Sequence, residues 1–265
     1  MRIEGSTALL TGATGGLGRA IAHSLAGGGA RLVLSSRKAE ELEELRSSLP
    51  GVGHRVVVSD LALEGAALEL LAEAGEIDVM VANAGLPASG RLDSFRQEEI
   101  ERALRVNLES PVRMARELVP AMTQRGSGHL VFLSSVSGKA ATARASLYAA
   151  TKFGLRGFAL CLRDDLRGSG VGVSVVSPGA IREAGMFAES GAHTPLVLGT
   201  GTPQQVGAAV VAAIERDRGE ITVAPLRQRA LSRIAVNAPE LSSRLTGRAA
   251  AKVADEIASG QTDKR

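Results

Sequence analysis

The side chains best suited to proton transfer are the single tyrosine and a lysine one helical turn later. Tyr148 is the one tyrosine among 265 residues, tryptophan is absent, and Lys152 follows four residues on. On a helix this spacing places the phenol and the ammonium on one face. A phenol has a pKa of about 10, and a nearby cation favours its anionic form. We therefore expect the pair to exchange a proton near neutral pH, although the same spacing also occurs in ordinary surface helices.

Short apolar runs alternate with helical patterns along the chain, which is typical of βαβ units and a parallel sheet. Strands are expected at residues 7–11, 31–35, 54–59, 77–82, 129–134, 172–177 and 220–224. Helices are expected at residues 17–26, 39–49, 62–74, 97–106, 111–124, 145–168 and 204–216. The predicted fold class is α/β, a single-domain, Rossmann-like, three-layer doubly wound fold with a seven-stranded parallel sheet.

Two segments depart from this alternation. Residues 178–202 have no clear periodicity, and a loop of this length is usually a lid or a binding loop. We therefore assign residues 1–225 to a dinucleotide-binding and catalytic domain with a substrate lid at about 178–202. Residues 226–265 are read as a basic helical C-terminal extension with a break at 237–239. We expect this extension to pack on its own body or a neighbouring subunit; a membrane-surface helix is the alternative.

Composition narrows the class of protein. The chain is 45% hydrophobic with a net charge of +3, too small an excess to indicate nucleic acid. Cys161 permits no internal disulfide and is expected to be a small core residue. The histidines, at 23, 54, 129 and 193, lack ligand spacing, so no metal site is expected. No secretory signal or membrane span is recognised, so we expect a cytoplasmic protein without membrane contact.

A glycine-rich turn lies between the first predicted strand and the first helix. Glycines there let the backbone approach a pyrophosphate, whose charge the helix N-terminus meets. The spacing is wider than Gly-x-Gly-x-x-Gly, and a simple tight loop is the alternative. We assign dinucleotide binding to the residues of this turn, Gly12, Thr14, Gly15, Gly16, Leu17 and Gly18.

The end of the second predicted strand bears on the choice of coenzyme. An acid there would hold the ribose 2′-hydroxyl of NAD, but the sequence is Ser36-Arg37-Lys38, with no carboxylate before Glu40. The planar guanidinium of Arg37 suits a 2′-phosphate. We therefore expect Ser36 and Arg37 to favour NADP(H), with NAD(H) as the alternative coenzyme if these are merely solvated charges.

Taken together, these motifs resemble the short-chain dehydrogenase/reductase family over residues 5–225. Further matches are Asp60 after the third strand, the Ala-Asn-Ala-Gly segment at 82–85, Asn107, Ser135 thirteen residues before Tyr148, and Pro178-Gly179. The resemblance implies an NAD(P)-dependent oxidoreductase with small-molecule substrates.

The resemblance also implies a role for each of four catalytic residues. Tyr148 would be the general acid or base at the substrate oxygen, and Ser135 would hydrogen-bond that oxygen. Lys152 would lower the pKa of Tyr148 and hold the nicotinamide ribose. Asn107 would hold a water that connects Lys152 to solvent; the alternative is a helix-start residue bonding its own backbone.

Coenzyme contacts outside the glycine turn follow from the same resemblance. They are Asp60, Leu61, Asn83, Ala84, Gly85, Tyr148, Lys152, Pro178, Gly179 and Ile181. One departure is Glu183, which stands where the family often has a threonine. A carboxylate there would repel the pyrophosphate unless Arg182 neutralises it or the loop turns it outward.

The expected substrate pocket is mainly small and aliphatic, with cations at its rim. Its residues are 86–90, 136–145, Met186 and Phe187, and the rim cations are Arg91, Lys139 and Arg144. Such a lining favours an apolar carbonyl or secondary alcohol, reduced or oxidised with NADP(H). The alternatives are a 3-oxoacyl-thioester reductase and a non-catalytic NADP(H)-sensing protein. The resemblance further implies a homodimer or homotetramer formed by helices at 107–124 and 145–168.

Overall fold

The computed structural model describes residues 1–184, 188, 199–238, 240 and 256. Seven strands form one sheet in the order β3-β2-β1-β4-β5-β6-β7, and every neighbouring pair is parallel. The strands are β1 Thr7–Thr11, β2 Arg31–Ser36, β3 Arg55–Val58, β4 Val79–Ala82, β5 Gly128–Leu133, β6 Val171–Pro178 and β7 Glu220–Val223.

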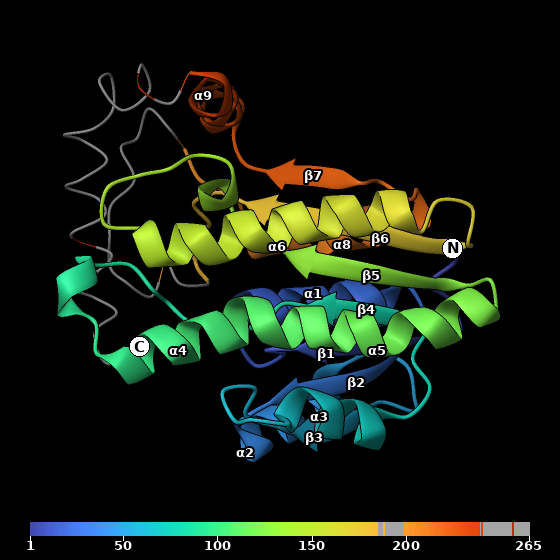
Figure 1. The fold of residues 1–265 in the computed structure, drawn as a ribbon. Coiled ribbons are helices and arrows are strands. Elements are labelled where there is room, and N and C mark those ends of the chain that lie inside the picture. Colours follow the sequence, from blue (N-terminus) through green and yellow to red (C-terminus); the bar gives the residue numbers. More distant parts are fainter. Residues whose placement is uncertain (185–187, 189–198, 239, 241–255, 257–265) are drawn as a thin grey trace.

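Helices cover both faces of this sheet (Figure 1). They are α1 Gly16–Gly27, α2 Ala39–Ser48, α3 Ala66–Ala74, α4 Gln97–Leu104, α5 Ser110–Gln124, α6 Ser146–Asp165, α8 Pro203–Glu215 and α9 Leu226–Asn237. Helices α1, α2 and α8 pack on one face, and α3, α5 and α6 on the other. The predicted single-domain, doubly wound parallel fold is confirmed.

The apolar strands explain this three-layer arrangement. All the residues of β4 and β5 are buried, so these strands need cover on both faces. Alternate residues of β5 enter the two cores, with Val131 in one and Phe132 in the other. Strand β1 pairs with both β2 and β4. Strands β2 and β3 are added on one side of β1 and the later strands on the other, so the strand order reverses there. The crevice at the carboxyl ends of β1 and β4 is where open α/β sheets bind ligands.

Three predicted helices differ from those observed. The helix expected at 62–74 begins at Ala66, because Gly65 has a φ of +81° and stops the helix from extending further back. The helices expected at 97–106 and 111–124 are one continuous helical run, because a π-helical turn, η2 (Arg105–Glu109), joins α4 to α5. Asn107 is therefore inside a helix and does not start one.

Cys161 corrects a further expectation. Its side chain is exposed on the outer face of α6, whereas we expected a small core residue. Leu155 and Ala159 occupy the buried face of the same helix. The apolar run around Cys161 therefore contains both buried and outward-facing positions, and residue type alone did not separate them.

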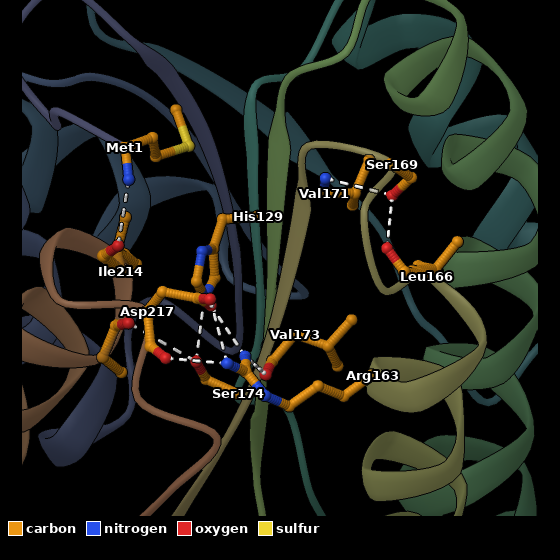
Figure 2. Close-up of polar contacts among 11 residues, drawn as sticks. Met1, His129, Arg163, Leu166, Ser169, Val171, Val173, Ser174, Ile214 and Asp217 are labelled. Carbon is orange, nitrogen blue, oxygen red and sulfur yellow. Dashed lines mark hydrogen bonds and ion pairs between the residues drawn. The ribbon is translucent and has the colours of Figure 1, made fainter.

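Burial strongly changes the pKa of His129, which lies on β5. It is 1% exposed, and its Nε2 lies 2.8 Å from Ser174 Oγ on β6 (Figure 2). Burial lowers the pKa of His129 to about 4, although the nearby Asp217 carboxylate favours the cation. The ring is therefore neutral in the folded protein at neutral pH.

We expect this histidine to make the protein sensitive to acid. The unfolded chain takes up the proton near pH 6.5 and the folded chain near pH 4, so the unfolded state binds it first. Stability is complete above pH 6.5 and falls by about 3 kcal/mol on reaching pH 4. Urea denaturation near both pH values should show a clearly smaller loss for His129→Gln than for the natural protein. Equal losses would contradict this assignment.

The described ends of the expected lid segment lie together and against α9. Gly201 N donates to Ala180 O over 2.8 Å, and Arg182 N donates to Gly201 O over 3.1 Å. Gln228 of α9 accepts from Ala180 N and donates to Gly199 O. The first helix of the C-terminal extension thus holds both ends of the segment. Residues 185–187 and 189–198, including Met186 and Phe187, lie outside the described residues, as do most residues after 238.

Candidate active site

Helix α6 carries Tyr148 and Lys152 on the face turned toward the sheet. Lys152 is 3% exposed, and its Nζ lies 5.7 Å from the centroid of the Tyr148 ring. The ammonium donates to Leu133 O, at the end of β5, over 2.9 Å. The predicted juxtaposition of phenol and lysine is therefore present, and the lysine is also anchored to the sheet.

The electrostatics of the pair differ from expectation. Burial raises the pKa of Tyr148 to about 12, and a hydrogen bond with Ser135 opposes the rise only in part. Burial lowers the pKa of Lys152 to about 8. The net pKa of Tyr148 is therefore raised, where we expected it to be lowered, because desolvation of the phenol is the largest effect. At neutral pH the phenol is protonated, as a proton donor must be.

Ser135 lies beside this phenol, two residues after β5 ends at Leu133. Ser135 has extended backbone geometry and starts the short 3₁₀ helix η3 (Val136–Gly138). Its Oγ accepts from Ser137 N over 3.1 Å and hydrogen-bonds Tyr148. The neighbouring Ser134 Oγ donates instead to Lys152 O over 3.0 Å. Ser135 is thus the serine that meets the tyrosine, and Ser134 ties the strand to α6.

Asn107 is fully buried in the π-helical turn η2. Its Oδ1 accepts from Leu86 N over 2.6 Å, and its Nδ2 donates to Leu86 O over 3.0 Å. Nδ2 also lies 3.5 Å from Thr151 Oγ1, whose hydroxyl donates to Tyr148 O. The asparagine therefore connects the loop after β4 with the helix that carries the tyrosine. The proposed water relay stays a prediction.

The glycine-rich turn joins β1 to α1 in a conformation that depends on glycine. Gly12 has a φ of +64°, and a Cβ there would lie 2.8 Å from Ala84 Cα. A Cβ on Gly18 would lie 2.2 Å from Gly12 O. Gly15 precedes α1 and has no side chain that could cap the helix. The first backbone N–H groups of α1 therefore receive no side-chain hydrogen bond from the cap position. Such a cradle fits a pyrophosphate.

Asn83 and Ala84 hold this turn from the neighbouring strand. Asn83 Nδ2 donates to the carbonyl oxygens of Thr11 and Gly12, each over 3.0 Å. Thr11 Oγ1 accepts from both Asn83 N and Ala84 N. Thr11 was not predicted as a site residue; its hydroxyl at the end of an otherwise apolar strand was the available signal. The segment after β4 therefore closes one side of the crevice, with Gly85 next in the chain.

The expected 2′-phosphate residues lie at the end of β2, where Ser36 is the last residue of the strand and Arg37 follows it. Ser36 Oγ accepts from Lys38 N, and Lys38 Nζ pairs with Glu41 at 2.5 Å. Arg37 is exposed and forms no ion pair within the described part of the chain. Arg19, which sequence reasoning missed, donates from Nε to Thr14 O and pairs with Glu44. A cation in the first turn of α1, where cations are disfavoured, was the signal for Arg19.

The residues expected to contact the adenine follow β3. Asp60 Oδ1 accepts from Ala62 N over 3.0 Å, which fixes the turn before α3. Leu61 is buried, and its carbonyl oxygen accepts from Ser110 Oγ of α5. Both residues thus belong to a rigid turn at the carboxyl edge of the sheet, next to the end of β2, where Ser59 N donates to Ser36 O.

The residues expected on the nicotinamide side lie at and after the end of β6. Pro178 ends β6, and Gly179 N donates to Val223 O of β7. Ile181 is 3% exposed and forms a β-bridge with Gly201. Glu183 and Arg182 are both exposed and pair at 3.1 Å, so Arg182 neutralises the carboxylate as one of the two expected solutions requires.

Two loops expected to frame the pocket are joined by hydrogen bonds. Gly90 N donates to Arg144 O, and Tyr148 N donates to Ala88 O. Arg144 has a φ of +63°, which turns its carbonyl oxygen toward Gly90. Arg91 pairs with Asp93 at 2.7 Å, on the exposed surface. Lys139 does not extend into the pocket as a rim cation; it is largely buried and pairs with Glu220 at 3.0 Å.

Fold and site together define a class: a dinucleotide-type crevice beside a serine, a tyrosine and a lysine suited to proton transfer. Residues 6–195 match the sequence profile of the family described as short chain dehydrogenase. The chain is 34% identical over 227 residues to Ketoacyl reductase HetN of Nostoc sp., covering 83% of this chain and 79% of that protein. The chain therefore belongs to the short-chain dehydrogenase/reductase family of oxidoreductases, which bind a nicotinamide coenzyme.

Other relatives and solved structures agree. The chain is 39% identical to Dehydrogenase/reductase SDR family member 7B of Bos taurus, over 68% of this chain and 59% of that protein. It is 34% identical to 3-oxoacyl-[acyl-carrier-protein] reductase FabG of Escherichia coli, over 68% of this chain and 75% of that protein. A short-chain dehydrogenase structure from Streptomyces avermitilis has a TM-score of 0.75 at 25% identity and covers 91% of this chain and 95% of its own.

In the described part of the chain, no helix is long and apolar enough to cross a membrane. Within the same residues, no three His, Cys, Asp or Glu side chains gather as metal ligands would.

Proposed function

We propose that this protein is an NADPH-dependent reductase of carbonyl compounds that also catalyses the reverse oxidation of secondary alcohols. The observation that carries the proposal is the geometry around Tyr148: its phenol hydrogen-bonds Ser135, and the centroid of its ring lies 5.7 Å from Lys152 Nζ. Ala88, Ala103 and Leu147 form the apolar cluster against which the tyrosine packs. A mainly apolar small molecule suits this lining.

Each of the chain's own groups has a role in this reaction. Tyr148 donates its phenolic proton to the carbonyl oxygen, and the Ser135 hydroxyl hydrogen-bonds the same oxygen and positions it. Lys152, with a pKa of about 8, is mainly a cation at neutral pH and stabilises the phenolate left behind. Asn107 connects the loop that follows β4 to helix α6. It is also proposed to hold the water through which Lys152 and Tyr148 are reprotonated.

A nicotinamide coenzyme, when bound, supplies the hydride. Its pyrophosphate would lie on the glycine turn of residues 12–18, with Asn83, Ala84 and Gly85 beside it. Asp60 and Leu61 would contact the adenine, and Pro178, Gly179 and Ile181 would line the nicotinamide side. Ser36 and Arg37 would take the 2′-phosphate. This distribution follows the carboxyl edge of the sheet from β3 to β6.

We expect Arg37→Ala to weaken NADPH binding about tenfold and to leave NADH binding unchanged. The guanidinium of Arg37 is exposed and without an ion pair among the described residues, so it is available to a phosphate. Titration followed by nicotinamide fluorescence gives both affinities without a substrate. Lys38→Ala, in which the lost ammonium is already paired with Glu41, is the matched control. Natural protein that binds NADH as tightly as NADPH would contradict the proposed preference.

A second candidate is a 3-oxoacyl-thioester reductase, favoured by the likeness to the HetN and FabG reductases. NADPH consumption with acetoacetyl-coenzyme A and with cyclohexanone separates the two candidates. A kcat/KM at least about tenfold higher for the thioester would assign the chain to thioester reduction. Tight NADPH binding without turnover of any carbonyl or alcohol would instead support a non-catalytic coenzyme sensor. A homodimer or homotetramer, and a location in the cytoplasm, are also proposed.

A further inference from the structure

Beyond the groups that meet the substrate, three charged side chains join the serine turn to the helix that carries the tyrosine. Glu220, the first residue of β7, accepts two hydrogen bonds from Arg156, to Oε1 at 2.7 Å and to Oε2 at 3.0 Å. Lys139 Nζ lies 3.0 Å from Glu220 Oε1 and donates to Thr222 Oγ1 over 2.7 Å. We call Lys139, Glu220 and Arg156 the charged clamp.

The two ends of the clamp lie on the two catalytic elements. Lys139 directly follows η3, four residues after Ser135, and its N–H donates to Val136 O. Arg156 follows Tyr148 and Lys152 at the same four-residue interval along α6, so the three side chains share one helix face. Glu220 therefore links the serine turn to the tyrosine–lysine face through a third element, β7.

The clamp is largely protected from solvent. The Lys139 side chain is 12% exposed and that of Glu220 is 23% exposed. Burial disfavours the charge of Glu220, yet the hydrogen bonds from Arg156 and Lys139 bring the pKa of Glu220 below its usual value. Bidentate pairing with a guanidinium also restricts orientation. A partly buried pair of this kind holds its geometry better than an exposed surface pair.

The turn η3 is held on one side by close packing against α6 and, just after its last residue, by the charged clamp. A Cβ on Gly138 would lie 2.7 Å from Lys152 O and 2.5 Å from Ser134 Oγ, so η3 already contacts α6 on that side. Directly after Gly138, Lys139 ties the turn to β7 through its contacts with Glu220 and Thr222. We propose that Lys139, fixed by Glu220 and Arg156, is a positioning residue that keeps the Ser135 hydroxyl against the Tyr148 phenol. This inference rests on the proposed reductase function.

The test compares Lys139→Met with Lys139→Arg, which keeps the positive charge. We expect Lys139→Met to lower kcat for acetoacetyl-coenzyme A or cyclohexanone about tenfold, with the Kd for NADPH unchanged, because the serine is displaced. Lys139→Arg should recover most of the loss. Glu220→Gln should act like Lys139→Met, and the double variant should be no worse than either single one, because both changes break the same link.

A matched control exists on the same helix. Arg163 of α6 forms an equally close bidentate pair with Asp217, at 2.7 and 2.9 Å, in the loop between α8 and β7 (Figure 2). Asp217→Asn removes this charge and keeps a residue type that tolerates its positive φ of 45°. We expect Asp217→Asn to leave kcat unchanged. An equal loss of kcat in this control would overturn the proposal, since any ion pair on α6 would then suffice.

A second readout needs no turnover. Because the chain has one tyrosine and no tryptophan, its intrinsic fluorescence comes from Tyr148 alone. The fluorescence lifetime of Lys139→Met should shift toward that of Ser135→Ala, and Lys139→Arg should stay with the natural protein. This shift without turnover of any carbonyl would uphold the positioning role and contradict the reductase function. An unchanged lifetime in Lys139→Met would overturn the positioning role whatever the activity.

Discussion

Tyr148→Phe is expected to lower kcat about 10²- to 10⁴-fold, the usual contribution of a positioned general acid. The change removes one hydroxyl and keeps the ring that packs against Leu147 and Ala103. The phenol is protonated at neutral pH and hydrogen-bonded to Ser135, so the substitution removes the proposed proton donor. Steady-state kinetics with NADPH and the better carbonyl substrate measure the loss.

A lower kcat in Tyr148→Phe indicates a loss of catalysis only if the variant still binds NADPH. Titration of Tyr148→Phe with NADPH should give a Kd within about twofold of the natural protein, because the glycine turn and Arg37 are untouched. Thermal unfolding should show that the variant folds. Turnover by Tyr148→Phe at more than about one tenth of the natural rate would place the proton donor elsewhere.

We expect Gly18→Ala to abolish measurable coenzyme binding, a loss of at least about 100-fold or 2.7 kcal/mol. The added Cβ would lie 2.2 Å from Gly12 O, 2.7 Å from Ala13 O and 2.9 Å from Ala13 C. All three atoms belong to the backbone, so the turn has to open and α1 has to move. The unpaired N–H groups at the start of α1 would then no longer face the pyrophosphate.

Gly27→Ala is the control for this substitution. Gly27 lies in the last turn of the same helix, and a Cβ there has no atom within 4 Å. Alanine also favours the helix relative to glycine, so stability should not fall. Fluorescence titration with NADPH should give the natural affinity for Gly27→Ala. Tight NADPH binding by Gly18→Ala would show that the coenzyme does not depend on this turn.

Local patterns in the chain were enough to predict most of the fold. Continuous apolar runs such as β4 and β5 need cover on both faces, and they predicted a parallel sheet with two helical layers. The spacing of Tyr148 and Lys152 was enough to place both on one helix face, as α6 has them. Element ends and the π-helical turn were missed, because they depend on single residues such as Gly65 and on how α4 and α5 pack together.

Some features of the site were likewise predictable from the sequence, and others depended on the tertiary structure. By itself the sequence determined which residue types stand at the glycine turn, the serine, the tyrosine and the lysine, and hence the family and its class of chemistry. The tertiary structure alone determined the direction of the Tyr148 pKa, the exposed position of Cys161 and the partners of Lys139. Each of these depends on groups distant in sequence: Lys139 and Glu220 stand far apart along the chain and meet only because β7 pairs with β6. Desolvation and ion pairing are set by such neighbours, whereas periodicity and spacing are set locally.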